Sequence, residues 1–389
     1  MKIDKSKKER SVFSNSSIKV PFFVPYITHE DKKAVSRALD APLLTDGPRL
    51  QEFESAFAKF SGAKYAVGVS NATSALHLSL KAAGIGCGDE VIIPDMTFVA
   101  TANAVLLCGA TPVLSDIDDD LNISISSIKK NLNPKTKAIL PVHMAGKTAK
   151  IDEIMRIARK NKLVLIEDCA HAIGTRVKSK HVGTFGDAGC FSFYPTKNIT
   201  TIEGGMVITN SKEIAKNIRS SRNHGITRTL RQRYTSGKPW EYDVNEPGYN
   251  YRLDEIRSTL GINQLKRIEM MNYLRRESCM YYNLKLKDVK GIVIPTFDRT
   301  DVYHLYIIRI TNEYKLKRDH LFKRLLKKGI MTSVHYKPIH KFTVFKKNAV
   351  TYDKLENSKK LYEQIISLPL YVGITRRLQD KVIDAIIDH

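Results

Sequence analysis

The segment Gly189-Cys-Phe-Ser-Phe-Tyr-Pro-Thr-Lys-Asn-Ile-Thr-Thr-Ile-Glu-Gly-Gly205 decides the fold of this chain. An apolar run precedes Lys197, and a Glu-Gly-Gly turn follows it and leads into a second apolar run, Met206–Thr209. A lysine between two strands is expected at the mouth of a sheet, where partial desolvation lowers its pKa and makes it a Schiff-base nucleophile. The alternative is a solvated surface lysine, which is the usual state of this residue.

A carboxylate lies just upstream of this segment. In Ile166-Glu-Asp-Cys-Ala-His-Ala-Ile-Gly174, Asp168 stands at the end of the apolar run Leu163–Ile166. A reactive amine and a carboxylate at strand ends are what pyridoxal phosphate requires, because the amine binds the aldehyde and the acid keeps the ring nitrogen protonated. The alternative for Asp168 is a helix N-cap, a common role of aspartate at a strand-to-helix junction.

Two further segments meet the other requirements of this cofactor. Val69–Leu76 opens a helix after an apolar run, so Ala72, Thr73 and Ser74 are predicted to bind the phosphate through N–H groups and hydroxyls. Phe98 follows another apolar run and offers a flat ring to the face of the cofactor. Simple helix capping and a core aromatic side chain are the respective alternatives.

Strand-like and helix-like runs alternate through about the first 210 residues. This alternation predicts an α/β fold whose mainly parallel sheet is covered by helices on both faces, with ligands bound beyond the carboxyl ends of the strands. A helical stretch from about Leu253 to Leu274 should lead to a smaller C-terminal α/β domain, and Gly225–Pro247 should be a long loop. The strand-like runs are Tyr65–Val69, Val91–Ile93, Thr111–Leu114, Ala138–Val142, Leu163–Ile166 and Met206–Thr209.

A chain of 389 residues is expected to form two domains. We predict a flexible N-terminal tail over residues 1–20, a large cofactor-binding domain over 21–252, and a linking helix with the small domain over 253–389. The first ten residues lack the apolar core of a signal peptide. No apolar run approaches the length of a membrane span, so we expect no membrane partner.

The formal net charge of +23 has three interpretations. The first is a generally basic surface, and the second is attraction of a dianionic sugar nucleotide and of the cofactor phosphate. The third is nucleic-acid binding. The basic residues are spread along the chain rather than gathered in one arm, so no nucleic-acid partner is predicted.

The five cysteines are odd in number and lack metal-ligand spacing. This pattern predicts reduced thiols in a cytoplasmic protein and no metal site. Cys169, although it adjoins Asp168, is interpreted as a small apolar filler.

The order of these motifs resembles that of the DegT/DnrJ/EryC1/StrS family of sugar aminotransferases, a branch of the fold-type-I pyridoxal-phosphate enzymes. The resemblance extends from about Pro21 to Ile383. It implies a large domain with a mainly parallel sheet and a smaller C-terminal α/β domain. Besides the segments above, the matching motifs are Leu44-Thr-Asp-Gly-Pro48, Gly88-Asp-Glu-Val-Ile-Ile-Pro94, Pro141-Val-His-Met-Ala-Gly146, Gly248-Tyr-Asn-Tyr-Arg252, Tyr303-His-Leu-Tyr306, Val334-His-Tyr-Lys-Pro338 and Ser367-Leu-Pro-Leu-Tyr371.

The resemblance implies further site residues. His171 would lie near the ring oxygen or ring face of the cofactor, and Ser192 would bind its phosphate. Asn250 would reach the cofactor phosphate of the neighbouring subunit and Arg252 its substrate, which implies a homodimer with shared active sites. His335 is predicted near the sugar. Core packing is the alternative for both histidines.

The activity implied by the resemblance is transfer of an amino group from L-glutamate to a nucleotide-linked keto sugar. The segments around Asp168, Lys197 and Asn250 are most similar to those of members that aminate the sugar 4-position, and amination of a 3-keto sugar or a keto-inositol is the alternative. Lys197 argues against the sugar dehydratases of the family, in which histidine replaces the lysine. A regulatory or nucleic-acid-binding relative would have no reason to keep Lys197 and Asp168 together.

Overall fold

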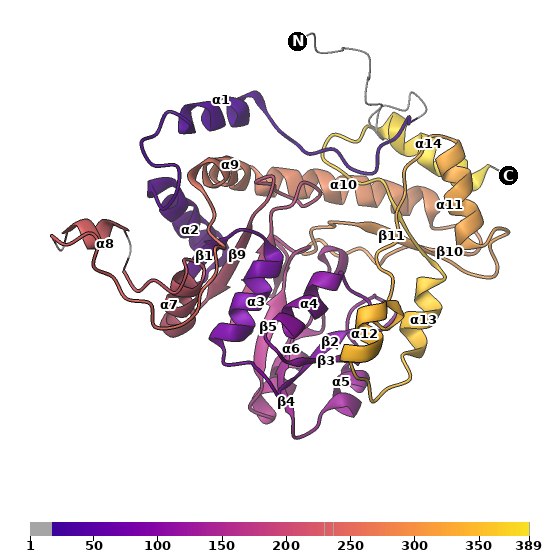
Figure 1. Ribbon diagram of the computed structural model, residues 1–389. Coiled ribbons are helices and arrows are strands. Elements are labelled where there is room, and N and C mark those ends of the chain that lie inside the picture. Colours follow the sequence, from indigo (N-terminus) through magenta and orange to yellow (C-terminus); the bar gives the residue numbers. More distant parts are fainter. Residues whose placement is uncertain (1–17, 229, 236, 389) are drawn as a thin grey trace, which may run out of the picture.

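A seven-stranded sheet in the order β1-β9-β8-β5-β4-β2-β3 forms the centre of the molecule in the computed structural model, which describes residues 18–228, 230–235 and 237–388 (Figure 1). Strand β9 runs antiparallel to both of its neighbours, and the other pairs are parallel. The predicted α/β fold with a mainly parallel sheet is thereby confirmed. The strands are β1 (Tyr65–Val69), β2 (Glu90–Pro94), β3 (Thr111–Ser115), β4 (Thr136–Ile139), β5 (Val164–Asp168), β8 (Ala188–Ser192) and β9 (Gly205–Thr209).

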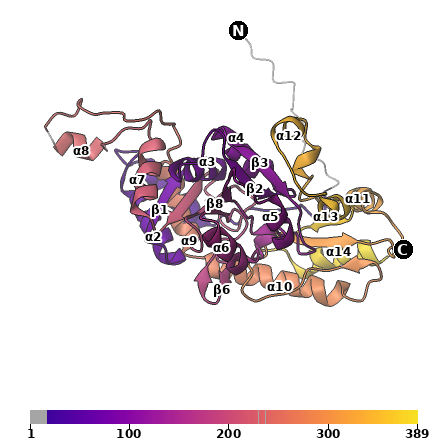
Figure 2. The ribbon, with the colours of Figure 1, turned by 90° about the horizontal axis from the view of Figure 1, so that it is seen from below.

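Helices cover both faces of this sheet, as Figure 2 shows from below. Successive side chains of a strand point to opposite faces, so Val91 and Ile93 pack in one core cluster while Ile92 packs in another. Every side chain of β2 is therefore buried. One face carries α3 (Ala72–Ala82), α4 (Val99–Leu107) and α7 (Lys212–Ser221), and the other carries α2 (Pro48–Ser61), α5 (Ile125–Asn131), α6 (Ile151–Lys160) and α9 (Glu255–Leu265).

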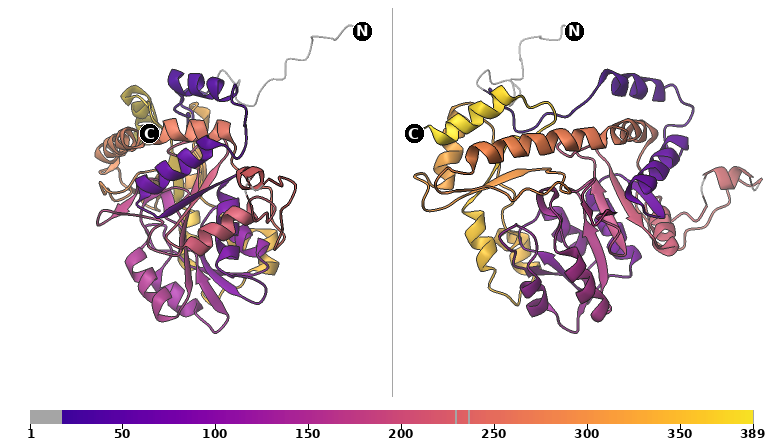
Figure 3. Two further views of the ribbon diagram at one scale, coloured as in Figure 1. Left: turned by 90° about the vertical axis from the view of Figure 1, so that its left-hand side faces the viewer. Right: turned by 180° about the vertical axis from the view of Figure 1, so that it is seen from behind.

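Three differences from the predicted elements exceed two residues. Strand β4 ends at Ile139 rather than Val142, since Pro141 has no N–H with which to continue the ladder. The helical stretch predicted over 253–274 is two helices, α9 and α10 (Ile268–Leu286). The predicted loop after Gly225 contains a short helix, α8 (Leu230–Thr235), on an arm that projects from the body of the molecule (Figure 3).

A three-stranded antiparallel sheet forms the core of the C-terminal part. Val20 is fully buried in that core and pairs with Ile330, so the predicted tail ends before Val20; residues 1–17 lie outside the described residues. The elements here are α10, β10 (Ile292–Val293), β11 (Tyr306–Ile310), α11 (Arg318–Lys327), β12 (Ile365–Leu368) and α14 (Arg376–Ile387). The remaining elements are α1 (His29–Ala38), η1 (Met144–Gly146), β6 (Arg176–Val177), β7 (Lys180–His181), η2 (Ile339–Lys341), α12 (Thr343–Asn348) and α13 (Glu356–Tyr362).

The segment from η2 to α13 returns to the edge of the large sheet. Asp95, which is fully buried after β2, accepts hydrogen bonds from the backbone N–H of His340 at 3.0 Å and the hydroxyl of Ser358 at 2.6 Å. The imidazole Nδ1 of His340 lies 2.7 Å from the same carboxylate. This packing crosses the domain division at residue 252, which stays a prediction.

We expect Asp95→Ala to lower the free energy of unfolding by about 3–5 kcal/mol, because it leaves buried donors without their acceptor. Asp119→Ala is the matched control, since Asp119 is 64% exposed in its ion pair with Arg309 and exposed pairs contribute about 0–1 kcal/mol. Urea denaturation measures both. Equal losses for the two variants would contradict the role assigned to Asp95.

Candidate active site

Lys197 lies in the loop that follows β8 and is half-buried. Its backbone N–H donates to the carbonyl of Tyr194 at 2.9 Å, which closes a turn and directs the chain back toward β9. Burial lowers the pKa of the Lys197 amine to about 8, although the nearby Asp168 carboxylate opposes this shift. A substantial share of the amine is therefore neutral and nucleophilic near pH 8.

Asp168 is the last residue of β5 and is 5% exposed. Its Oδ2 accepts from the Thr101 hydroxyl at 3.0 Å, and its Oδ1 accepts from the Ala170 N–H at 3.1 Å. Burial raises the pKa of this carboxyl, whereas the two hydrogen bonds and the Lys197 ammonium act in the opposite direction. Thr101 was missed in the sequence analysis, although it lies one helical turn beyond Phe98 on α4.

The first turn of α3 presents free backbone N–H groups beyond the end of β1. Asn71 is the N-cap, and its side-chain oxygen accepts from the N–H of Ser74 at 2.8 Å. The first backbone bond within the helix joins the N–H of Ala75 to the carbonyl of Asn71, so the N–H groups of Ala72 and Thr73 precede it. The positive end of the helix dipole and these groups suit an anion.

Strand register brings Ser192 to the same turn. Ser192 pairs with Gly205 on β9, and Gly205 pairs in turn with Val69 on β1. A Cβ on Gly205 would lie 2.5 Å from the Asn71 carbonyl oxygen, so β9 approaches this turn as closely as a backbone can. The predicted phosphate-binding residues Ser192, Ala72, Thr73 and Ser74 are thus neighbours.

Phe98 lies at the N-cap of α4, and its side chain is 55% exposed. This exposure leaves a ring face available to a ligand. The Tyr336 ring lies 5.8 Å away, tilted by 50°. Tyr336 follows β11 and α11 in the chain, so the C-terminal part contributes to this cluster.

His171 lies behind Tyr336 and is buried, with its Nε2 3.1 Å from the Tyr336 hydroxyl. Its ring packs against that of His304, with the centroids 4.4 Å apart. Burial holds the pKa of both imidazoles well below the usual range, and Lys197 lowers them further. His304 was not assigned a role in the sequence analysis, and its Nδ1 is buried without a partner among the described residues.

Three other predicted residues lie at different distances from this cluster. His335 adjoins it, its Nδ1 2.8 Å from the Ser367 hydroxyl, and burial lowers its pKa to about 4. The side chain of Asn250 is exposed, and Arg252 donates to the Asn223 side chain at 2.6 Å rather than into the site. The roles of all three stay predictions.

A buried cluster of His143, Glu167 and Cys169 was also missed in the sequence analysis, although its ligand atoms lie within 4.8 Å of one another. Its polar groups already have protein partners. Glu167 accepts from three backbone N–H groups, of which that of Gly183 is 2.8 Å away, and lies 3.1 Å from His143 Nε2. His143 Nδ1 accepts from the N–H of Ala149. We therefore interpret the cluster as a structural hydrogen-bond network beside Asp168.

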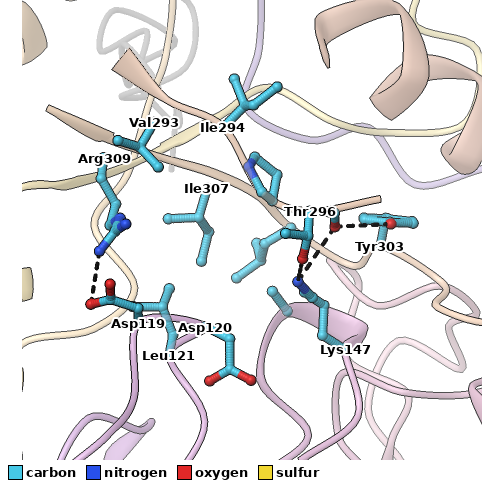
Figure 4. A pocket seen from close by; sticks show the side chains of 13 residues that line it. Asp119, Asp120, Leu121, Lys147, Val293, Ile294, Thr296, Tyr303, Ile307 and Arg309 are labelled. Atoms are coloured by element: carbon cyan, nitrogen blue, oxygen red, sulfur yellow. Dashed lines mark hydrogen bonds and ion pairs between the residues drawn. The ribbon is translucent and has the colours of Figure 1, made fainter. Parts of the chain in front are cut away.

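A cavity of about 250 Å³ lies between the strands β10 and β11 and the segments around Asp119 and Lys147 (Figure 4). It is closed by the ion pair of Arg309 with Asp119 at one end, at 3.0 Å, and by Lys147 bonded to Thr296 at the other. Apolar side chains such as Ile307 cover its floor. None of the site residues predicted from the sequence lines it.

Comparison with known proteins agrees with this arrangement. The family model of the DegT/DnrJ/EryC1/StrS aminotransferases matches residues 25–387. The spore coat polysaccharide biosynthesis protein SpsC of Bacillus subtilis is 38% identical over 376 residues, which are 95% of this chain and 96% of SpsC.

Two solved structures show the same fold. Helicobacter pylori PseC, an aminotransferase involved in the biosynthesis of pseudoaminic acid, has a TM-score of 0.88 and 33% identity over 94% of this chain and 98% of its own. The PLP-form of the putative sugar aminotransferase Spr1654 from Streptococcus pneumoniae has a TM-score of 0.87 and 28% identity over 94% of this chain and 97% of that chain.

The fold and the site define a pyridoxal-phosphate-dependent enzyme of fold type I. The cluster fits this cofactor, since it combines an amine of lowered pKa, a buried carboxyl, first-turn N–H groups and an exposed ring. The chain belongs to the DegT/DnrJ/EryC1/StrS aminotransferase family and is a sugar aminotransferase. The resemblance and the cofactor expected from the sequence are thereby confirmed.

The pKa of Lys197 leads to a prediction about cofactor loading. The rate at which pyridoxal phosphate bonds to the apoprotein should rise with pH through about 8 and then level, because the neutral amine is the nucleophile. Asp168→Asn should move the midpoint to lower pH, since it removes the charge that raises this pKa. Stopped-flow absorbance measures the rate, with N-acetyl-lysine as the reference amine. A midpoint near the ordinary value of 10.5 would contradict the assignment.

Proposed function

We propose that this enzyme transfers an amino group from L-glutamate to a nucleotide-linked keto sugar, at the sugar 4-position. The observation that carries the proposal is the placement of Lys197 and Asp168 at neighbouring strand ends beside the open N-terminus of α3. The names of relatives support a role in polysaccharide or amino-sugar biosynthesis, since SpsC and PseC are both described in such terms.

Asp168, Phe98 and Lys197 would each have a distinct role in transamination. Pyridoxal phosphate, when bound, supplies an aldehyde that exchanges amino groups and a ring that accepts electrons. Asp168 would hold a proton on the ring nitrogen, and Phe98 would cover one ring face. Lys197 Nζ takes the proton from the α-carbon of the donor and later delivers one to the sugar carbon that gains nitrogen.

Four residues beyond the ends of β1 and β8 would hold the cofactor phosphate. Ala72 and Thr73 would donate backbone N–H groups, and the hydroxyls of Ser74 and Ser192 lie at the same turn.

A homodimer with shared sites accounts for surfaces that one chain leaves uncovered. Trp240 and Tyr234 on the projecting arm are 74% and 67% exposed, and Phe98 at the site is also open. Aromatic side chains are enriched at interfaces between subunits, so a partner is expected to cover those of the arm. In this proposal Asn250 and Arg252 face the cofactor phosphate and substrate of the partner, and His335 faces the sugar.

The sequence supports the position of amination and the location of the enzyme. The 4-position is favoured by the segments around Asp168, Lys197 and Asn250, and a 3-keto sugar or a keto-inositol is the alternative acceptor. The free state of all five cysteines is compatible with the predicted cytoplasmic location. Among the helices of residues 18–228, 230–235 and 237–388, none is long and apolar enough to cross a membrane.

The holoenzyme should form 2-oxoglutarate from L-glutamate and then aminate one member of a panel of UDP- and dTDP-linked 4-keto, 3-keto and non-nucleotide keto sugars. Mass spectrometry of the sugar product measures the gain of nitrogen. Amination of a 3-keto sugar alone would overturn the 4-position, and amination of none would overturn the nucleotide-sugar assignment.

Two substitutions test the residues that carry the proposal. Lys197→Ala should abolish amination, and Asp168→Ala should slow it by at least about 100-fold, since each removes an interaction that the reacting centre requires. Lys337→Ala is the matched control, because Lys337 is an exposed lysine of the same region. Full activity of Lys197→Ala would show that another group moves the proton.

A further inference from the structure

The hydrogen bonds of His171 determine which of its ring nitrogens carries hydrogen. A neutral imidazole has one donor nitrogen and one acceptor nitrogen. The backbone N–H of Ala145 points at Nδ1 across 3.4 Å, so Nδ1 is the acceptor. The hydrogen of the neutral ring must therefore reside on Nε2, which faces the Tyr336 hydroxyl.

The same reasoning fixes the direction of the next hydrogen bond. Nε2–H of His171 donates to the Tyr336 oxygen across 3.1 Å. The Tyr336 hydroxyl therefore does not donate its own hydrogen to His171. Among the residues that the structure describes, no acceptor faces that hydroxyl hydrogen. A half-buried phenol is thus left with one unused donor.

Charge and burial preserve this arrangement over the working pH range. Burial, Lys197 and His335 all lower the pKa of His171, which keeps the ring neutral. Burial, and next the Asp168 carboxylate, raises the pKa of Tyr336, which keeps the phenol protonated. The chain of donors from Ala145 through His171 to Tyr336 therefore has one direction.

The free end of this chain lies within the cofactor site. The Tyr336 ring is between Phe98, whose centroid is 5.8 Å away, and His171, whose ring is nearly parallel to it. Its hydroxyl faces His171, which follows Asp168 by three residues, and the Asp168 carboxyl would hold the ring nitrogen. His171 itself has no unused N–H, and one of its faces packs against His304.

We infer that Tyr336 donates a hydrogen bond to an oxygen atom of the bound cofactor or substrate, and that His171 is a positioning residue that orients it. The acceptor is either the ring oxygen of pyridoxal phosphate or an oxygen of the sugar. Only the second of these acceptors, an oxygen of the sugar, rests on the proposed function. His171 then acts through its tautomer rather than by touching the cofactor with a nitrogen.

The tautomer of His171 tests the inference without any measurement of activity. Nitrogen-15 chemical shifts of the labelled, full-length apoprotein distinguish protonated from bare ring nitrogens, and His171→Asn identifies the signals by their loss. We expect hydrogen on Nε2 and none on Nδ1 from pH 6 to 8. Hydrogen on Nδ1 would overturn the inference, because the Tyr336 hydroxyl would then have to donate to His171.

Removal of the hydroxyl distinguishes the two acceptors. Tyr336→Phe should raise either the Kd for pyridoxal phosphate, measured by equilibrium dialysis, or the KM for the keto sugar, by about tenfold. The matched control is Tyr282→Phe, which removes a buried hydroxyl that donates to the Pro369 carbonyl at 3.0 Å in the small-domain core. Both constants should stay within about twofold of wild type in that control.

The outcomes separate this inference from the proposed function. A raised Kd assigns the ring oxygen of the cofactor, and a raised KM with an unchanged Kd assigns the sugar. Both constants unchanged would overturn the inference even if the sugar is aminated as proposed. If the panel contains no substrate, the proposed function fails, while the tautomer still tests the direction of the hydrogen bonds and the Kd still tests the cofactor oxygen as the acceptor.

In the Tyr336→Phe background, substitution of His171 should no longer affect binding. Adding His171→Phe to that variant should change the Kd or KM no further, whereas His171→Phe alone should weaken binding in the same direction. Additive effects of the two substitutions would show that His171 acts independently of Tyr336, which contradicts a positioning role.

Discussion

The burial of an ionisable carboxyl at the end of β5 is the constraint on which the site depends. A charged group in an apolar interior is unfavourable unless hydrogen bonds and an opposite charge compensate it. Asp168 has the Thr101 hydroxyl, the Ala170 N–H and the Lys197 amine for this purpose. The same burial lowers the pKa of Lys197, so one environment prepares both the acid and the amine.

The alternation of side chains along β5 separates this reactive carboxyl from a structural one. Glu167 points to the opposite face of the sheet, as the two-residue period requires. There it is fully buried, lies 3.1 Å from His143 and accepts three backbone N–H groups. Glu167 thus has no capacity left for a ligand, whereas Asp168 still faces the site. Two adjacent carboxylates consequently differ in role because they differ in hydrogen-bond partners.

The strand ends, and the positions of Lys197 and Asp168 beside them, could be predicted from local sequence patterns, because residues adjacent in the chain determine them. Lys197 and Asp168 follow apolar runs, and the register of β8, β9 and β1 then brings Ser192 to the turn before α3. Contacts between distant segments could not be predicted in this way. The Thr101–Asp168 bond spans 67 residues, and the Tyr336–His171 bond spans 165.

The contacts between the C-terminal part of the chain and the large sheet could not be predicted from the sequence either. The return of the chain from η2 to α13 depends on Asp95, whose partners His340 and Ser358 follow it by 245 and 263 residues. No periodic pattern marks such a contact. Asn250 and Arg252 present a different difficulty, since their predicted partners belong to a second subunit and a single chain carries no signal for them.

The proposed chemistry depends on the covalent bond between Lys197 and the cofactor. Reduction of the holoenzyme with borohydride, followed by proteolysis and mass spectrometry, locates the lysine that bonds to pyridoxal phosphate. We expect the pyridoxyl mass on the peptide that contains Lys197 and on no other. The label on a different lysine, or its absence from a protein that still transaminates, would contradict this expectation.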